Sequence, residues 1–146
     1  MMQLIKAIHT AYNDPTDPEL SDLKTANTGG LWTEEAKQNL AMPYIVLHHI
    51  TGGIDHTMGC GSDIVGGPKR AVVQFSIFGS TFSMVREIYD KLVAAYDNTG
   101  SLVYAAEFGI QAATPVSMIR INETGPTQFK KDIWMVTVDY EVYRTG

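Results

Sequence analysis

The C-terminal segment shows the clearest alternation of apolar and polar positions in the chain. From Asp132 to Tyr143 the sequence reads DIWMVTVDYEVY, and every second residue from Trp134 to Val142 is apolar. A period of two predicts a strand with one apolar face and one mixed face. At roughly 3.3 Å per residue such a strand is about 40 Å long, well beyond the usual length of about 5–6 residues. Such a strand can pair with several neighbouring strands, or it can project past its own domain and pair with another subunit.

Helical periodicity occurs in two segments. Ser80–Asn98 places a stripe of apolar residues on one side and charged residues on the other, so we predict a helix with Ser80 as its N-cap. Gln3–Tyr12 shows a shorter stripe of the same kind, and Pro15 soon after it is typical of a helix end. Both stripes need an apolar partner, and the apolar face of the C-terminal strand supplies one.

The remaining segments are shorter and less regular. Thr16–Gly30 is polar and ends in two glycines, so we interpret it as a connector or a mobile loop. Glu34–Leu40 is expected to form a helical turn, and Thr124–Phe129, which contains a Gly-Pro pair, predicts a chain turn. The predicted strands that precede the C-terminal one are Leu31–Trp32, Tyr44–Thr51, Ala71–Phe78, Leu102–Phe108 and Pro115–Glu123.

These elements predict an α+β fold. Its sheet is mainly antiparallel, two amphipathic helices pack on one face, and a long strand ends the chain. The 146 residues suit a single domain spanning 1–146, with a mobile loop at 52–70. The predicted core comes from the stripe of the second helix and the apolar face of the long strand: Phe82, Val85, Tyr89, Leu92, Trp134, Val136, Val138 and Tyr140.

Composition and charge restrict the classes of function. The formal net charge is −5, whereas a nucleic-acid-binding surface is normally basic. An acidic wall that DNA slides past without binding stays compatible with this charge. The lone Cys60 excludes a disulfide within the chain, which fits a reducing cytoplasm. No apolar run is long enough to span a membrane, and Met1–Tyr12 does not resemble a signal peptide, so we expect a soluble chain without a membrane partner.

The segment Gly52–Arg70 resembles a phosphate-binding loop only superficially. It contains six glycines and lies between two predicted strands. A Walker-type cradle requires GxxxxGK[ST] between a strand and a helix, whereas Gly61–Lys69 reads GSDIVGGPK and a strand follows. The GxGxxG pattern that begins at Gly59 has Ile64 in place of its last glycine. We interpret the segment as a flexible hairpin loop or as an interaction loop that orders on assembly.

Histidine and cysteine side chains gather around the same segment. His56 and Cys60 have a spacing that two zinc ligands can adopt. His48 and His49 are consecutive in a predicted strand and therefore point to opposite faces, so at most one of them can join such a site. The glycine-rich setting offers these ligands little rigidity. A polar strand end beside a mobile loop is the better interpretation.

Asp139 and Glu141 lie two residues apart on one face of the long strand. Paired carboxylates can act as acid and base, but on an exposed strand face they more commonly form a solvated pair that protects an edge. The sequence contains no convergent set of acid, base and nucleophile. We therefore expect a protein that is not an enzyme and that has no catalytic residue, no metal and no cofactor.

Three stretches together resemble the tail terminator (tail completion) family of long-tailed bacteriophages. They are GGLWTEEAKQNLAMPYIVLHHI at Gly29–Ile50, VVQFSIFGSTFSMVREIYDKLVAAYDN at Val72–Asn98, and WMVTVDYEVY at Trp134–Tyr143. Their order and spacing are similar to the family over most of the chain. The sequence departs from the family's pattern in the size of the Gly52–Arg70 loop and in the polar Thr16–Thr28 stretch.

The resemblance implies a structural role without catalysis. Members form a ring, usually of six copies, that terminates the tail tube and joins it to the head connector, and DNA passes through the ring. The implied partners are further copies of this chain, the tail tube protein and the connector protein, with DNA as passing cargo. The implied location is the head-proximal end of the virion tail, and the host cytoplasm during assembly.

The resemblance also suggests which residues serve assembly. Asp139 and Glu141 are candidates for the lumen face. The candidates for an assembly loop are Gly52, Gly53, Asp55, Gly59, Gly61, Asp63, Lys69 and Arg70. Two alternatives remain open: another head–tail joining or tube-like ring protein, and a metal-binding enzyme built on His49, His56 and Cys60.

Overall fold

Five strands form one sheet in the computed structural model, which describes residues 8–9, 12–13, 18–37, 39–51, 69–97 and 116–144. The order across the sheet is β1-β2-β3-β5-β4, and only the β1–β2 pair is parallel. The bounds of the strands are β1 Leu31–Thr33, β2 Tyr44–Thr51, β3 Lys69–Gly79, β4 Val116–Lys130 and β5 Ile133–Arg144. The predicted long C-terminal strand is therefore present, between β3 and β4.

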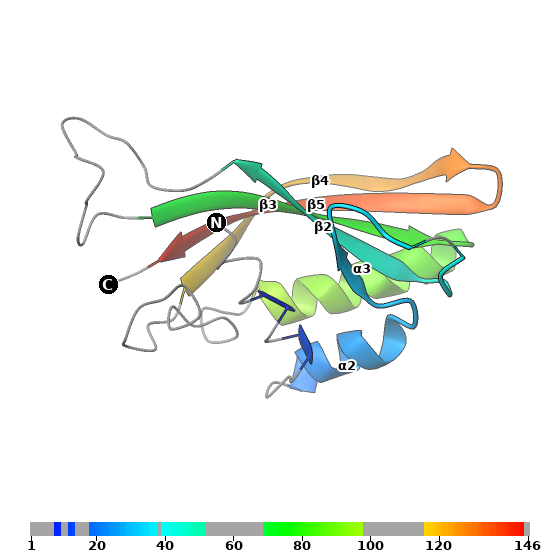
Figure 1. Cartoon of the computed structure of the whole chain (residues 1–146), viewed down its shortest axis with the longest axis horizontal. Helices are drawn as coiled ribbons and strands as arrows, with labels where there is room; N and C mark the ends of the chain where they lie inside the picture. The colour runs from blue at the N-terminus through cyan, green and yellow to red at the C-terminus, as the bar shows by residue number, and fades with distance from the viewer. Residues whose placement is uncertain are drawn as a thin grey trace.

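Two helices, α2 (Pro18–Ala26) and α3 (Phe82–Tyr96), lie on the same side of the sheet (Figure 1). Helix α3 contacts β3, β4 and β5, and α2 packs beside α3. The predicted α+β fold with helices on one face of a mainly antiparallel sheet is thus confirmed. Residues 8–9 and 12–13 are also helical, and both Ile8 and Tyr12 are buried. The rest of the predicted Gln3–Tyr12 helix lies outside the described residues.

The core lies between the sheet and the helices. On the sheet side, alternate residues of β2, β3 and β5 point toward the helices, as a period of two requires. Phe75 on β3 stacks on Tyr96 of α3, with ring centroids 5.0 Å apart, and meets Tyr140 of β5 edge-on at 5.9 Å. The buried side chains of this layer include Ile45, Leu47, Val73, Phe75, Ile77, Val85, Ile88, Leu92, Tyr96, Val136, Val138, Tyr140 and Val142.

Most of the residues expected in the core lie there. Among the eight, Val85, Leu92, Val136, Val138 and Tyr140 are buried, whereas Tyr89 and Trp134 are partly buried and pack against the buried cluster. The expectation for Phe82 is wrong, because its side chain is 43% exposed. Phe82 is the first residue of α3, where the chain leaves the sheet, and its ring meets Trp134 edge-on at 5.7 Å.

The predicted connector at Thr16–Gly30 contains a helix instead. Pro18 begins α2, a position that suits proline because its missing N–H would have no partner there. Glu19 in the first turn and Lys24 in the last turn complement the helix dipole. Only Leu20 and Leu23 are buried, so the apolar stripe is too short to give a clear periodic signal.

The predicted helical turn at Glu34–Leu40 is wrong. Glu34 and Asn39 have positive φ angles of 64° and 60°, which a right-handed helix excludes. Instead, the Glu34 N–H donates to the carbonyl of Leu47 at 2.9 Å, extending the contact between β1 and β2 by one residue. This segment then leads to Pro43 and into β2.

The predicted turn at Thr124–Phe129 is also wrong, because β4 continues through it. The pairing register with β5 shifts between Thr124 and Thr127, so Gly125 and Pro126 are absorbed as a bulge. Proline is tolerated at such a place because β4 is an edge strand and the ladder needs no N–H there. The chain instead reverses at Lys131–Asp132, where Asp132 has a φ of 64°.

Strand β3 and helix α3 begin at residues other than those predicted. Strand β3 begins at Lys69, so Lys69 and Arg70 belong to the sheet and not to the preceding loop as predicted; their backbones pair with Arg144 and Tyr143. The N-cap of α3 is Thr81 and not Ser80. The predicted strand Leu102–Phe108 lies outside the described residues. Within the described ranges, no helix is long and apolar enough to cross a membrane.

Candidate functional site

One face of the sheet points away from both helices, and we call it the outer face. Cross-strand partners share a face, so the register fixes its members. None of the helices in the described part of the chain covers it (Figure 1). The outer face includes Tyr44, Val46 and His48 of β2; Val72, Gln74, Ser76 and Phe78 of β3; Met135, Thr137, Asp139 and Glu141 of β5; and Ile119, Asn122, Thr124 and Thr127 of β4.

The predicted lumen candidates Asp139 and Glu141 both lie on the outer face. Each is partly exposed. The Gln74 side-chain amide donates to Asp139 Oδ1 at 2.9 Å, which holds this carboxylate across the β3–β5 pair. Glu141 lies between Val72 of β3 and Ile119 of β4. The two carboxylates therefore place negative charge along β5 on the helix-free side of the sheet.

A third carboxylate lies where β1 ends beside β2. Glu34 accepts a hydrogen bond from the backbone N–H of His49 at 3.0 Å, and its other oxygen lies 3.3 Å from Nδ1 of His48. The pKa of Glu34 is lowered, first by the backbone hydrogen bond from His49 and then by the side chain of His48. These contacts hold the end of β1 beside β2. The lowered pKa keeps the Glu34 carboxylate charged at neutral pH.

Aromatic rings occupy one end of the outer face. Tyr44 stacks on Phe78 with centroids 5.0 Å apart, and Phe129 of β4 meets Phe78 edge-on at 5.7 Å. Phe129 is nevertheless 50% exposed. The ammonium group of Lys130 lies 5.5 Å from the centroid of the Phe129 ring. This end of the sheet thus presents apolar surface together with positive charge.

The hairpin formed by β4 and β5 reaches the right-hand end of the molecule in Figure 1. Strand β4 lies at the edge of the sheet, so one side of its backbone is free of a neighbouring strand in the described structure. Ile119 and Ile121 on this strand are 52% and 47% exposed. Exposed apolar side chains on an open edge are typical of a strand that pairs with another chain.

A polar network connects the middle of the hairpin to α3. The Arg120 guanidinium contacts the Tyr89 hydroxyl at 2.8 Å, Glu123 at 3.3 Å and Asp97 at 3.3 Å. Tyr89 also donates to Glu123, and Tyr140 donates to Asp97 at 2.7 Å. Burial first, and the hydrogen bond to Asp97 second, raise the pKa of Tyr140. These charge-assisted bonds fix the angle between the hairpin and the helix.

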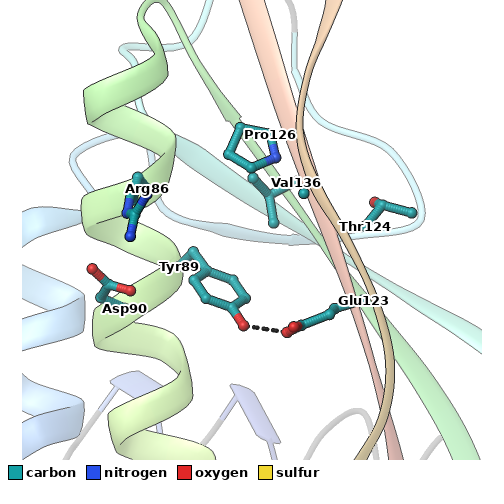
Figure 2. Close-up of a pocket in the computed structure, with 8 residues that line it drawn as sticks. Arg86, Tyr89, Asp90, Glu123, Thr124, Pro126 and Val136 are labelled. Carbon is teal, nitrogen blue, oxygen red and sulfur yellow. Dashed lines mark hydrogen bonds between the residues drawn. The ribbon is translucent and has the colours of Figure 1, made fainter.

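A pocket of about 150 Å³ lies beside this network, between α3 and the hairpin (Figure 2). The helix contributes Arg86, Tyr89 and Asp90, and Figure 2 shows the Tyr89 side chain directed toward Glu123 of the hairpin. The hairpin contributes Glu123, Thr124, Gly125 and Pro126 from β4 and the buried Val136 from β5. The pocket therefore combines apolar walls with charged groups.

Most of the other predicted site residues lie outside the described part of the chain. Of the assembly-loop candidates, only Lys69 and Arg70 have a described backbone, and both begin β3. His56 and Cys60 lie outside the described residues, and no group of three metal-ligating side chains occurs among those that are described. The remaining assembly-loop candidates also lie outside the described residues: Gly52, Gly53, Asp55, Gly59, Gly61 and Asp63.

The pocket and the network were not predictable from the sequence pattern. The pocket depends on β4 continuing past Glu123, whereas Gly125-Pro126 is typical of a turn. The only signal in the sequence is the pair Arg120 and Glu123, whose opposite charges lie three residues apart. That spacing does not predict that Arg120 also contacts Tyr89, which lies on α3 and is 31 residues earlier in the sequence.

Solved structures share this fold. One is a chain in the virion of a native gene transfer agent (GTA) particle, which is 13% identical, with a TM-score of 0.60 and 98% of each chain covered. A second solved chain, which has no functional name, is 14% identical, with a TM-score of 0.58, and covers 100% of this chain and 96% of its own. No protein-family model matches the sequence, and no curated protein matches it. At these identities the likeness shows a common fold.

Proposed function

We propose that this chain is a structural virion protein that forms a ring at the end of a phage tail tube. The ring stops tube growth and joins the tube to the head connector, and DNA passes through its centre. The observation that carries this proposal is the shared fold with a chain of a GTA virion, which extends over 98% of both chains. A likeness over the whole of both chains supports a common architectural role more than a shared motif would.

The outer face is the surface we assign to the lumen. Its carboxylates Asp139 and Glu141 repel the phosphates of DNA, which limits binding while the duplex passes. The opposite face carries α2 and α3 and so forms the outside of the ring. With this orientation the edges of the sheet, β4 above all, face the neighbouring subunits.

The loop at 52–70 is proposed to contact the tube or the connector. Strand β2 ends at Thr51 and β3 begins at Lys69, both at the end of the sheet opposite the β4–β5 turn (Figure 1). Under this proposal the chain acts as one domain without catalysis, in the head-proximal part of the virion tail and, before that, in the host cytoplasm. Six copies is the ring size that the family resemblance implies.

A different joining ring or a tube-like subunit is the alternative. The GTA likeness supports it equally, because that chain is described only as part of a virion. The two functions differ in position: a terminator occupies one ring at the head-proximal end of each tail, whereas a tube subunit repeats along its length. Gold labelling of tagged copies in assembled particles distinguishes them.

Capping of tail tubes tests the proposal. Purified protein is mixed with growing tubes of the tail tube protein, and tube lengths and ends are imaged by negative-stain electron microscopy. We expect shorter tubes with a ring at one end. Tubes that grow to the same length with bare ends would contradict the terminator function.

A further inference from the structure

The second half of the edge strand β4 is poorly suited to pairing with another strand. Proteins protect their sheet edges from such pairing with bulges, proline and charged side chains. Residues 122–130 have all three: the pairing register with β5 shifts around Pro126 and again before Lys130, and Glu123 and Lys130 are charged. An added strand could not keep a regular set of hydrogen bonds along this half of β4.

The first half of β4 is regular and has little charge. From Val116 to Arg120 every residue pairs with β5 without a shift. The only charged side chain in this part, Arg120, is held against α3 by Asp97. Among the five large apolar side chains that the described part of the chain exposes, three lie on β4, and two of these are Ile119 and Ile121. An edge with apolar side chains and without protection is typical of one that another strand covers.

Strand β1 forms the other edge of the same sheet. Gly30 and Glu34, on either side of β1, form backbone hydrogen bonds with β2. Because the backbone groups of a strand alternate in direction, Leu31 and Thr33 direct their N–H groups away from β2. The strand has three uncharged residues, LWT, and is therefore short enough to pair within the regular part of β4.

We propose that residues 116–121 of one copy accept β1 of the next copy as an added strand. This inference rests on the proposed ring and identifies one of its contacts. The two edges differ, so the contact is heterologous, and such contacts generate rings when the rotation between copies closes. A strand added edge to edge continues the sheet, so the outer faces of all copies stay on one side, as the lumen assignment requires. The side chain of Ile119 is then covered by a cross-strand neighbour.

Hydrogen–deuterium exchange of the natural full-length chain tests the contact, measured below and above the concentration at which it assembles. On assembly, edge amides in 116–121 and in Leu31–Thr33 should exchange about tenfold more slowly or less, whereas those in 122–130 should not change. Protection of only one of the two strands, or of neither, overturns the contact while the ring stands. Slow exchange of these amides already in single copies would show that each chain covers its own edge, and it overturns the contact as well.

A lysine on the edge provides a second test. Ile119→Lys places a charge in the regular part of β4, and Gln128→Lys makes the same change of charge in the protected half, as the matched control. Both natural side chains are exposed, and circular dichroism verifies folding. By sedimentation, Ile119→Lys should raise the protein concentration needed for half-assembly by about tenfold or more, and Gln128→Lys by less than about threefold. Normal assembly of Ile119→Lys, or an equal loss in both variants, overturns the contact. If the natural chain itself never assembles, the proposed function fails with it.

Discussion

Two buried tyrosines make the stability of the fold sensitive to alkaline pH. Burial raises the pKa of Tyr96, which stacks on Phe75 in the core. Burial and the hydrogen bond to Asp97 raise the pKa of Tyr140. The unfolded chain loses these protons near pH 10, whereas the folded chain keeps them. Above that pH the unfolded state therefore binds fewer protons, and the free energy of unfolding falls as the pH rises.

The expected slope is up to about 1.4 kcal/mol per pH unit for each tyrosine, beginning near pH 10. Urea unfolding between pH 8 and pH 12 measures it. Tyr140→Phe should be less stable at pH 8 by about 0.5–1.5 kcal/mol, because the bond to Asp97 is lost, but should lose stability less steeply above pH 10. An unchanged slope in this variant would show that Tyr140 ionises normally in the folded chain.

Gly29 lies where no side chain fits. A Cβ there would be 2.1 Å from the carbonyl oxygen of Ala41 and 2.7 Å from Cβ of Tyr44. Gly29→Ala should therefore lower the free energy of unfolding by about 1–3 kcal/mol or more, because the backbone must move. Gly125 is the matched control, since its Cβ would meet no atom within 4 Å. Gly125→Ala should change stability by less than about 1 kcal/mol, and thermal melts of both variants compare them.

At the scale of elements, the start of α3 provides a sharp test. The Thr81 hydroxyl accepts a hydrogen bond from the N–H of Met84 at 3.1 Å, whereas Ser80 only approaches the Met84 sulfur at 3.7 Å. Thr81→Ala should cost about 0.5–2 kcal/mol of stability, and Thr81→Ser should retain most of it. Ser80→Ala should be nearly neutral. Equal losses from Ser80→Ala and Thr81→Ala in chemical unfolding would contradict the assigned cap.

The elements that the sequence predicts well are those with a long periodic signal. The alternation in β5 and the apolar stripe of α3 extend over 12 and 15 residues, so single exceptions such as the exposed Phe82 do not hide them. Helix α2 has only two buried residues, so the sequence pattern does not predict a helix there. Strand β4 was cut short because Gly125-Pro126 resembles a turn, while its bulge is fixed by pairing with β5.

The candidate site could be predicted from the sequence only where it depends on a pattern within one strand. The placement of Asp139 and Glu141 on the mixed face follows from alternation within one strand. The pocket and the Arg120 network join α3 to a strand far away in the sequence, and no local pattern encodes that contact.

At the scale of the whole molecule, the charge of the outer face should affect DNA passage and not folding. The variant Asp139→Lys with Glu141→Lys should keep the fold, since both side chains are partly exposed, and should still form rings. Lysines facing the lumen would bind phosphates and slow the DNA. We expect at least a tenfold loss of DNA delivery by assembled particles. Normal delivery would contradict the lumen assignment, and Asp22→Lys on α2 serves as the control.

A cryo-electron microscopy reconstruction of the assembled protein tests the central claim most directly. The account predicts a closed ring with an open centre, in which the outer face with Asp139 and Glu141 points inward and α2 and α3 point outward. Adjacent copies should meet along β4. A protein that stays monomeric at every concentration, or a ring whose helices line the centre, would contradict it.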